Sequence, residues 1–247
     1  MFGAIRTARA TIRSFRIYYG DGKRAAAMDR LYRRFVQPGD LVFDVGAHVG
    51  DRVASFRRLG ARVVAIEPQP AMVRVLRLLY GLSRSVTVEQ TAVGSDQGRA
   101  RMMINVDNPT VSSLSSAFVD AARDAPGWET QRWTKSAAIA ITTLDTLTER
   151  HGQPSFIKLD VEGFEAEALQ GLSRAVPALS FEFTTIQRDV ALACIARCSS
   201  LGYVSFNAAL GESHALLDDW LDATEIARWL KALPPEANSG DIYARIA

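Results

Sequence analysis

The sequence predicts an α/β fold in which a mostly parallel, doubly wound sheet carries helices on both faces. Short apolar runs alternate with stretches of helical periodicity over residues 41–90, and a second alternation of this kind covers residues 155–207. Such an alternation is typical of βαβ units. The composition, 48% hydrophobic and 23% charged over 247 residues, is that of a globular domain large enough to bury its own core.

The first half of the sheet is predicted by short apolar or alternating runs bounded by turn residues. The expected strands are residues 41–45, 62–66 and 86–90. The helix after the first strand stops at Gly60, a residue suited to a helix C-cap. The next helix covers residues 70–79, because Pro70 suits a first helical turn and the apolar positions that follow lie on one stripe.

The second half continues the alternation and is interrupted by one long irregular segment. The expected elements are a strand at 155–159, a helix at 165–172, a strand at 179–183, a helix at 190–201, a strand at 203–207, a helix at 221–233 and a strand at 242–246. Between Gly94 and Ala140 we expect a loop, because short apolar pieces are separated there by Asn, Ser, Pro and Gly. A connection this long in a compact domain is usually functional or mobile.

Positive charge is concentrated in the first 34 residues, which hold nine Lys or Arg and two Asp, although the whole chain has a net charge of +2. Ile5, Ile12, Phe15 and Tyr19 recur among the arginines at helical spacing. We therefore expect a basic helical arm at 1–37 before a domain at 38–247. The arm either makes a weak contact with an anionic membrane surface or an acidic partner, or packs as a solvated helix across the domain edge. No module that reads nucleic acid accompanies it.

Cysteine content and hydropathy predict a cytoplasmic protein. The only cysteines are Cys194 and Cys198, which cannot supply a four-ligand zinc site and which we expect to be reduced and buried. No apolar run reaches the roughly 18 residues of a membrane span. Arginines interrupt the apolar positions near the N-terminus, which a signal peptide would not tolerate.

The first expected strand ends in a glycine-containing segment. Its sequence is Asp44-Val45-Gly46-Ala47-His48-Val49-Gly50. Ligands of open α/β sheets bind outside the carboxyl ends of the strands, and glycine lets the backbone approach a ligand closely. A dinucleotide site has the pattern G-x-G-x-x-G, whereas a P-loop has Gly-Lys followed by Ser or Thr. Neither pattern is present, so the spacing disfavours a nicotinamide dinucleotide and excludes a P-loop.

Glu67 is the first residue after the second expected strand and follows Gly46 by 21 positions. A carboxylate there can accept hydrogen bonds from both hydroxyls of a ribose. The alternative is that Glu67 caps the helix that begins near Pro70. Because the glycine loop lies beside it, we favour ribose binding, which indicates an adenosine-type ligand.

An acidic cluster follows the fourth expected strand, in the segment Phe-Ile-Lys-Leu-Asp-Val-Glu-Gly-Phe-Glu at 156–165. Asp160 and Glu162 are thereby placed at the same edge of the sheet as the glycine loop, where a charge buried without a partner is costly. We expect both to be functional. Glu165 and Glu167 are expected to complement the positive end of the following helix.

These motifs together resemble the FkbM-type methyltransferases. The resemblance covers residues 38–207 and is carried by D-V-G-A-H-V-G (44–50), A-I-E-P-Q-P (65–70), A-V-G-S-D-Q-G (92–98), S-S-L (112–114), T-L-D-T-L (143–147), I-K-L-D-V-E-G-F-E (157–165) and L-S-F-E-F (179–183). One departure is His48, where the family usually has Asn. This histidine introduces a candidate charge switch near pH 6.5.

The resemblance implies a Rossmann-like sheet of seven strands, the last of them antiparallel, and S-adenosylmethionine as the cofactor. It implies that Asp44 and Gly46 approach the methionine part, that Glu67 holds the ribose, and that Thr91 lies near the adenine. The expected cofactor-binding residues are Asp44, Gly46, Ala47, His48, Gly50, Glu67, Pro68, Thr91, Ala92 and Asp160.

The resemblance also implies methyl transfer to an oxygen, so that alignment and a group to take the hydroxyl proton are required. We expect Asp160 and Glu162 to orient and deprotonate the acceptor, with His48 and Glu182 as further catalytic candidates. No metal ion is expected. A divalent cation held by Asp160, Glu162 and Glu182 is the alternative.

The expected acceptor is a hydroxyl of a sugar, glycan or natural product. Residues 111–135 are the expected lid on the acceptor side, where Trp128 and Trp133 either stack on sugar rings or form a small core of their own. Two other functions stay open: a nucleotide-cofactor oxidoreductase, and a non-catalytic binding module that keeps the fold. The sequence does not indicate an oligomeric state.

Overall fold

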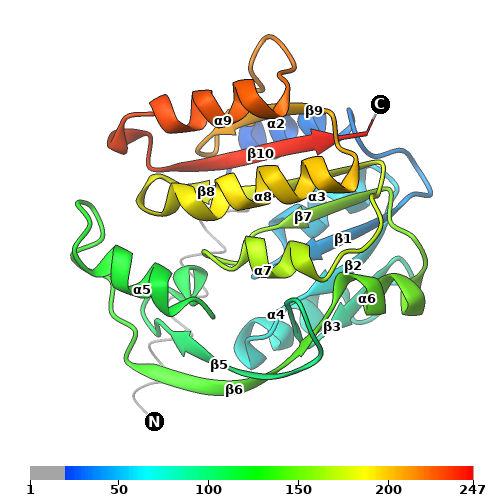
Figure 1. The fold of residues 1–247 in the computed structure, drawn as a ribbon. Coiled ribbons are helices and arrows are strands. Elements are labelled where there is room, and N and C mark those ends of the chain that lie inside the picture. The colour runs from blue at the N-terminus through cyan, green and yellow to red at the C-terminus, as the bar shows by residue number, and fades with distance from the viewer. Residues whose placement is uncertain (1–19, 247) are drawn as a thin grey trace.

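The computed structural model describes residues 20–246. Its main sheet has seven strands in the order β3-β2-β1-β7-β8-β10-β9 (Figure 1). Their bounds are β1 Leu41–Val45, β2 Arg62–Ile66, β3 Val86–Glu89, β7 Phe156–Leu159, β8 Ala178–Thr184, β9 Ser205–Leu210 and β10 Ser239–Arg245. β10 is antiparallel to both of its neighbours, and the other paired strands of this sheet are parallel. The expected Rossmann-like sheet with an antiparallel last strand is confirmed.

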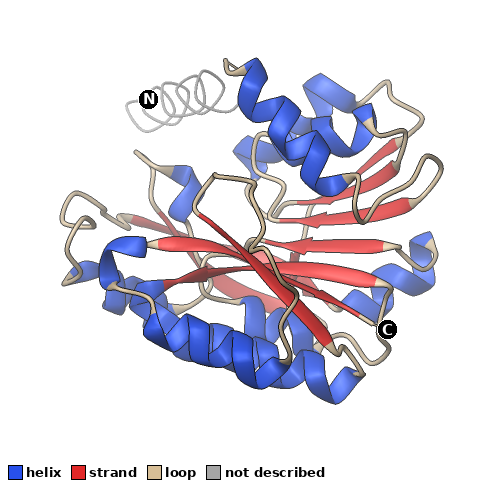
Figure 2. Ribbon diagram, turned by 90° about the horizontal axis from the view of Figure 1, so that it is seen from above, coloured by secondary structure: helices blue, strands red, loops and turns tan. Residues whose placement is uncertain are grey.

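Helices cover both faces of this sheet (Figure 2). Their bounds are α2 Gly22–Tyr32, α3 Asp51–Arg58, α4 Pro70–Tyr80, α5 Ser116–Arg123, α6 Leu144–His151, α7 Glu165–Gln170, α8 Arg188–Leu201 and α9 Ala223–Ala232, with short 3-10 turns η1 Pro109–Val111, η2 Thr185–Gln187 and η3 Pro235–Ala237. Alternate strand residues point to opposite faces. Val42 and Val63 accordingly pack with α2, α3 and α4, whereas Phe43 and Val64 pack with α6 to α9.

Residues 92–142 contain a second, three-stranded sheet where we expected a loop. β4 Ala92–Val93, β5 Gly98–Ile104 and β6 Lys135–Thr142 pair in the order β4-β6-β5. Figure 1 shows β5 and β6 as a ribbon outside the main sheet. The buried core of this sheet is small, namely Ala92, Met102 and Ile139, and much of both long strands is exposed. A partly exposed ribbon needs little apolar alternation, which explains why the sequence pattern did not predict it.

The described part of the expected N-terminal arm is α2, which packs on the domain. The Asp21 side chain caps this helix by accepting hydrogen bonds from the N–H groups of Lys23 and Arg24. At its other end Tyr32 is buried, and its ring centroid lies 4.5 Å from that of Phe56 in α3. The apolar positions that predict an earlier helix, Ile5, Ile12, Phe15 and Tyr19, lie outside the described residues.

None of the helices within residues 20–246 combines the length and the apolar character that a membrane span needs. Cys194 and Cys198 of α8 are both free thiols buried in the core, as expected.

Candidate active site

The carboxyl ends of β1, β2 and β7 border a cavity with about 940 Å³ of empty space, part of it open to solvent. The sequence-predicted residues that line this cavity are Asp44, Gly46, His48, Glu67, Pro68, Thr91, Ala92, Asp160, Glu162 and Glu182. Ala47 and Gly50 are not among its lining residues. Ala47 packs in the core, and the carbonyl of Gly50 accepts a hydrogen bond from the Tyr80 hydroxyl at 3.0 Å. Both therefore shape the loop rather than the cavity wall.

Gly46 brings the loop after β1 into direct contact with the loop after β7. Its φ is 85°, and a Cβ added to it would lie 1.8 Å from the carbonyl oxygen of Asp160. A side chain is excluded both by this contact and by the left-handed backbone. The N–H of Asp160 also donates to the carbonyl of Val45 at 3.0 Å. The backbone thus places Asp160 beside the glycine loop.

Glu67 is a buried carboxylate whose two oxygens are held by the backbone. The N–H of His48 donates to Oε2 at 2.9 Å, and the N–H of Gln69 donates to Oε1 at 2.8 Å. Burial outweighs these two hydrogen bonds and raises the pKa of Glu67 to about 7. Gln69 is the N-cap of α4, so Glu67 also orders the start of that helix. Each oxygen keeps a lone pair that can accept a hydrogen bond from a ligand hydroxyl.

Asp44 has a buried oxygen without a hydrogen-bond partner among the described residues. The residue is 2% exposed, and its Oδ2 is the unpaired atom. Burial, together with the nearby charge of Asp51, raises the pKa of Asp44 to about 7. Leaving a buried polar atom unpaired costs about 1–3 kcal/mol. Because Asp44 lines the cavity, this oxygen is suited to a ligand that supplies a donor.

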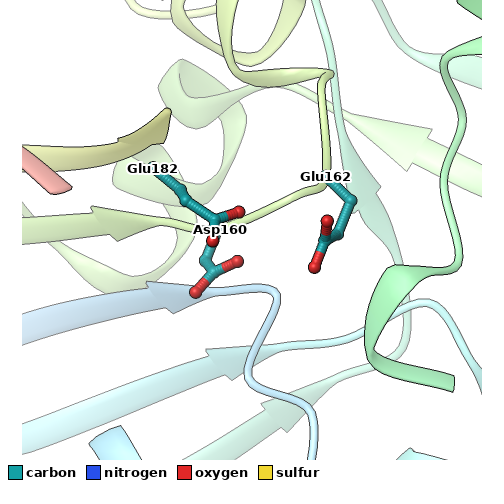
Figure 3. A group of neighbouring side chains, drawn as sticks. All are labelled: Asp160, Glu162 and Glu182. Atoms are coloured by element: carbon teal, nitrogen blue, oxygen red, sulfur yellow. The ribbon is translucent and has the colours of Figure 1, made fainter. Parts of the chain in front are cut away.

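Asp160, Glu162 and Glu182 bring three carboxylates together from three parts of the chain (Figure 3). Asp160 directly follows β7, Glu162 lies in the turn before α7, and Glu182 lies in β8. One oxygen from each lies within 4.8 Å of the others. Burial and the charge of Asp160 raise the pKa values of Glu162 and Glu182 above the ordinary range. Burial also acts on Asp160, but the Lys158 ammonium overcomes it and holds the pKa of Asp160 below its usual value.

Lys158 is a buried cation beside this cluster rather than a strand residue reaching for solvent. It is 1% exposed, and its Nζ lies 3.3 Å from Oδ2 of Asp160 and 2.8 Å from Oδ1 of Asp241 in β10. Both carboxylates raise the pKa of Lys158 against the effect of burial. Lys158 therefore stays charged and is shared between two carboxylates.

The turn that carries Glu162 is held in an unusual backbone conformation. Glu162 has a φ of 55°, which non-glycine residues seldom adopt. The hydroxyl of Ser113 donates to the Glu162 carbonyl at 2.6 Å. On the other side, Oε1 of Glu165 accepts from the N–H groups of Val161 and Gly163 at 2.9 and 3.4 Å. Such a conformation persists where its surroundings enforce it, as at many functional sites.

His48 is neutral at physiological pH. Burial lowers its pKa to about 4, because the charged imidazolium loses its hydration there. The charge switch that we expected near pH 6.5 is therefore wrong for this site: the surroundings move the transition well into the acidic range.

A charged network at the cavity wall is not predicted by any motif in the sequence. Glu212, after β9, lies 2.7 Å from Nη2 of Arg24 in α2 and 3.2 Å from Nη2 of Arg52 in α3. These arginines lower the pKa of Glu212 to about 2 in spite of burial. Arg52 and Glu212 both line the cavity. Residues 24, 52 and 212 meet only in the folded chain, so no spacing in the sequence could indicate the network.

The expected lid contributes its first residues to the cavity, whereas its two tryptophans pack elsewhere. Ser112 and Leu114 line the cavity. Trp128 and Trp133 lie against Phe118, with ring centroids 5.4 and 6.3 Å away, and the indole N–H of Trp133 donates to the carbonyl of Val111 at 2.8 Å. Of the two roles considered for these tryptophans, the structure shows the small core.

Fold and cavity together define a class of protein: an α/β protein with a ligand cavity where the strand order reverses beside β1. Residues 44–226 match the family model described as the Methyltransferase FkbM domain. The chain therefore belongs to the FkbM methyltransferase family. It is an S-adenosylmethionine-dependent methyltransferase, as the motifs predicted.

Solved structures with a similar arrangement include other methyltransferases at low sequence identity. A precorrin-6y C5,15-methyltransferase from Geobacter metallireducens matches with a TM-score of 0.45 and 11% identity over 90% of this chain and 87% of its own. A TehB-like methyltransferase from Corynebacterium glutamicum matches with a TM-score of 0.45 and 12% identity over 90% and 88%. An O-methyltransferase from Thermotoga maritima matches with a TM-score of 0.43 and 11% identity over 92% and 66%. A search of curated proteins finds no match.

The residues of the cavity fit S-adenosylmethionine, the cofactor of this family. The unpaired Oδ2 of Asp44 would accept from the ammonium of the methionine part, and Glu67 would accept from the ribose hydroxyls. Thr91, Ala92 and Met102 form a less polar part of the wall that would hold the adenine. A sulfonium cation also suits a cavity with several carboxylates.

Proposed function

We propose that this protein methylates a hydroxyl oxygen of a sugar, glycan or natural-product acceptor, and that Asp160 and Glu162 orient and deprotonate that hydroxyl. The observation that carries the proposal is the group of three carboxylates at the cofactor cavity, of which Glu162 is buried and Asp160 and Glu182 are half-buried. A hydroxyl is a weak nucleophile and must lose its proton as its bond to the methyl carbon forms. The bound cofactor supplies an electrophilic methyl group on a sulfonium.

Glu162 is suited to receive the proton. An ordinary glutamate, with a pKa near 4.3, is a weak base at neutral pH. Burial and the Asp160 charge raise the pKa of Glu162, which makes its ionised form a stronger base. Asp160 has a lowered pKa and stays ionised, so it is suited to accept a hydrogen bond from the acceptor and to position it.

The proposal is tested with labelled methyl donor and a panel of sugar, lipid-linked glycan and small hydroxyl acceptors, compared with matched amines and thiols. We expect transfer to hydroxyls alone. With the accepted substrate, Glu162→Gln should lower kcat about 10²- to 10⁴-fold, the usual contribution of a general base. Asp160→Asn should lower kcat as well, because the acceptor loses the charged group that positions it. Glu167→Gln, an exposed residue of α7 outside the cavity lining, is the matched control.

Binding of S-adenosylhomocysteine, followed by calorimetry, shows whether each variant keeps its cofactor site. Near-normal turnover in both Asp160→Asn and Glu162→Gln, with cofactor binding intact, would refute the roles of these residues. Transfer to amines or thiols in preference to hydroxyls would refute the acceptor class.

A further inference from the structure

Three carboxylates converge beside the cofactor cavity more closely than their charges favour. Asp160, Glu162 and Glu182 each place one oxygen within 4.8 Å of the other two. Figure 3 shows the side chains of Asp160 and Glu182 next to each other and that of Glu162 extending from the facing turn. Oxygens that bind one cation at roughly 2.0–2.6 Å lie at most about 5.2 Å apart. The three side chains are therefore within reach of a common ion.

Glu162 supplies an observation that is independent of this clustering. It is only 7% exposed, and its carboxylate has no hydrogen-bond donor within residues 20–246. The hydrogen bonds around the turn end on its backbone or on its neighbours. A largely buried carboxylate that has no donor on the protein is costly unless a group in the cavity it lines, water or a cation, satisfies its oxygens. The turn thus holds Glu162 toward the other two carboxylates with its own ligand atoms free.

The two cations beside the cluster, Lys158 and Arg52, are shared with or held by carboxylates outside it. Nζ of Lys158 is closer to Asp241, at 2.8 Å, than to Asp160, at 3.3 Å. Arg52 pairs with Asp51 at 2.6 Å and with Glu212 at 3.2 Å. Neither side chain has an ion pair with Glu162 or Glu182 among the described residues. The three carboxylates therefore outnumber the cations that pair with them, and Lys158 pairs with Asp160 alone among the three.

We propose that Asp160, Glu162 and Glu182 form a binding site for a divalent cation of the Mg²⁺ or Mn²⁺ type. The donor set consists of carboxylate oxygens without cysteine or histidine, and hard cations prefer such ligands. All three residues line the cofactor cavity, so part of the coordination sphere would face the space in which an acceptor binds. Each residue offers one oxygen to the cation, so the second oxygen of Glu162 stays available to receive the hydroxyl proton.

A cation at this site would also favour a particular class of acceptor. This inference about the acceptor rests on the proposed hydroxyl methylation. A cation with open positions binds a hydroxyl best when a second oxygen on the adjacent carbon completes a chelate. A vicinal diol, an α-hydroxy carbonyl or an α-hydroxy acid offers such a second oxygen, and we expect the acceptor to belong to this class. Coordination to the cation makes the hydroxyl more acidic and fixes its oxygen at one position.

The test of the site uses the purified full-length protein and Mn²⁺ alone, without cofactor or acceptor. Electron paramagnetic resonance should show one bound Mn²⁺ per chain, displaced by excess Mg²⁺. Glu162→Gln and Glu182→Gln should each weaken Mn²⁺ binding at least tenfold, whereas Glu167→Gln should bind as the parent protein does. Circular dichroism confirms that each variant is folded. The Mn²⁺ titration of the parent protein decides the question even if a variant fails to fold.

Absence of bound Mn²⁺ at millimolar concentration, or binding that is unchanged in both folded Gln variants, overturns the site. Turnover measured after EDTA has removed divalent cations distinguishes three claims: the cation site, the chelated acceptor and the methylation of hydroxyls. Bound Mn²⁺ with full turnover in EDTA overturns the chelated acceptor and supports the site. Hydroxyl methylation without any Mn²⁺ binding overturns the site and leaves the proposed function standing. Bound Mn²⁺ with methylation of amines alone supports the site and refutes the proposed function.

Discussion

At the scale of single residues, the site depends on carboxylates whose charge is costly in the folded chain. Asp44, Glu67 and Glu165 are all buried, and burial raises the pKa of each to about 7. Their protonation therefore changes within the physiological range, unlike that of an ordinary surface carboxylate. Cofactor affinity and stability should both depend on pH because of these groups.

Glu67 makes cofactor binding pH-dependent. We expect its ionised form to accept hydrogen bonds from two ribose hydroxyls, so binding should tighten as pH rises from about 5.5 to 8 and should release a proton near pH 6. Glu67→Gln should bind S-adenosylhomocysteine about 10- to 100-fold more weakly at pH 8, given about 1.5–3 kcal/mol for hydrogen bonds to a charged group. Calorimetry in buffers of different ionisation enthalpy measures both quantities. An unchanged pH profile in the variant would show that another group binds the ribose.

Glu165 makes the folded state sensitive to alkaline pH. Its folded pKa of about 7 lies above the ordinary value of 4.5, so the folded chain binds more protons than the unfolded chain. Its contribution to stability is complete below about pH 4.5 and is lost as pH rises to about 7. Glu165→Gln should therefore raise the free energy of unfolding by about 1–3 kcal/mol at pH 8 and change it little at pH 4.5. Urea unfolding at both pH values tests this, with Glu167→Gln as the control.

At the scale of elements, the contact between the β1 and β7 loops should tolerate no side chain at Gly46. A Cβ there meets the carbonyl oxygen of Asp160 at 1.8 Å, in a left-handed backbone. Gly46→Ala should abolish measurable cofactor binding and lower the free energy of unfolding by about 2 kcal/mol or more, as strain at such a backbone position does.

The matched control is Gly98→Ala in β5, because an added Cβ at Gly98 has open space and an ordinary φ. This variant should keep its stability within about 1 kcal/mol and its cofactor affinity. Urea unfolding and calorimetry measure the free energy of unfolding and the cofactor affinity of both variants. Equal values for Gly46→Ala and Gly98→Ala would contradict the steric argument.

The sequence predicts the deeply buried strands well and the partly exposed strands poorly. β1 is buried at all five positions and was predicted to the residue, because a strand covered on both faces is a continuous apolar run. β5 and β6 form a partly exposed ribbon whose sheet has a buried core of three residues. The sequence of these two strands therefore resembles that of a loop. Of the predicted site residues, Gly46, Glu67 and Asp160 directly follow such buried strands. Arg52 and Glu212 escaped prediction because their meeting depends on tertiary structure.

At the scale of the whole molecule, α2 is part of the domain core and is more than an accessory arm. Met28, Leu31 and Tyr32 are at most 3% exposed, and the Tyr32 ring also lies 5.8 Å from that of Phe156 in β7. The boundary that we placed at residue 37 stays a prediction, but the packing shows that α2 shares its core with the sheet.

Tyr32→Ala should accordingly lower the free energy of unfolding by about 3–5 kcal/mol, the usual cost of truncating a large buried aromatic side chain. Tyr32→Phe keeps the ring and should cost less than about 1.5 kcal/mol. Thermal and urea unfolding of the full-length variants measure both. A small loss in Tyr32→Ala would mean that α2 detaches without disturbing the rest of the core.

The position of β10 has a consequence for the order in which the molecule is assembled. β10 lies between β8 and β9, although both are translated before it. A growing chain therefore carries two unsatisfied strand edges until residues 239–245 leave the ribosome, and only then does Asp241 reach the Lys158 ammonium. The half of the sheet that bears Glu182 thus reaches its final form only after residues 239–245 have been made.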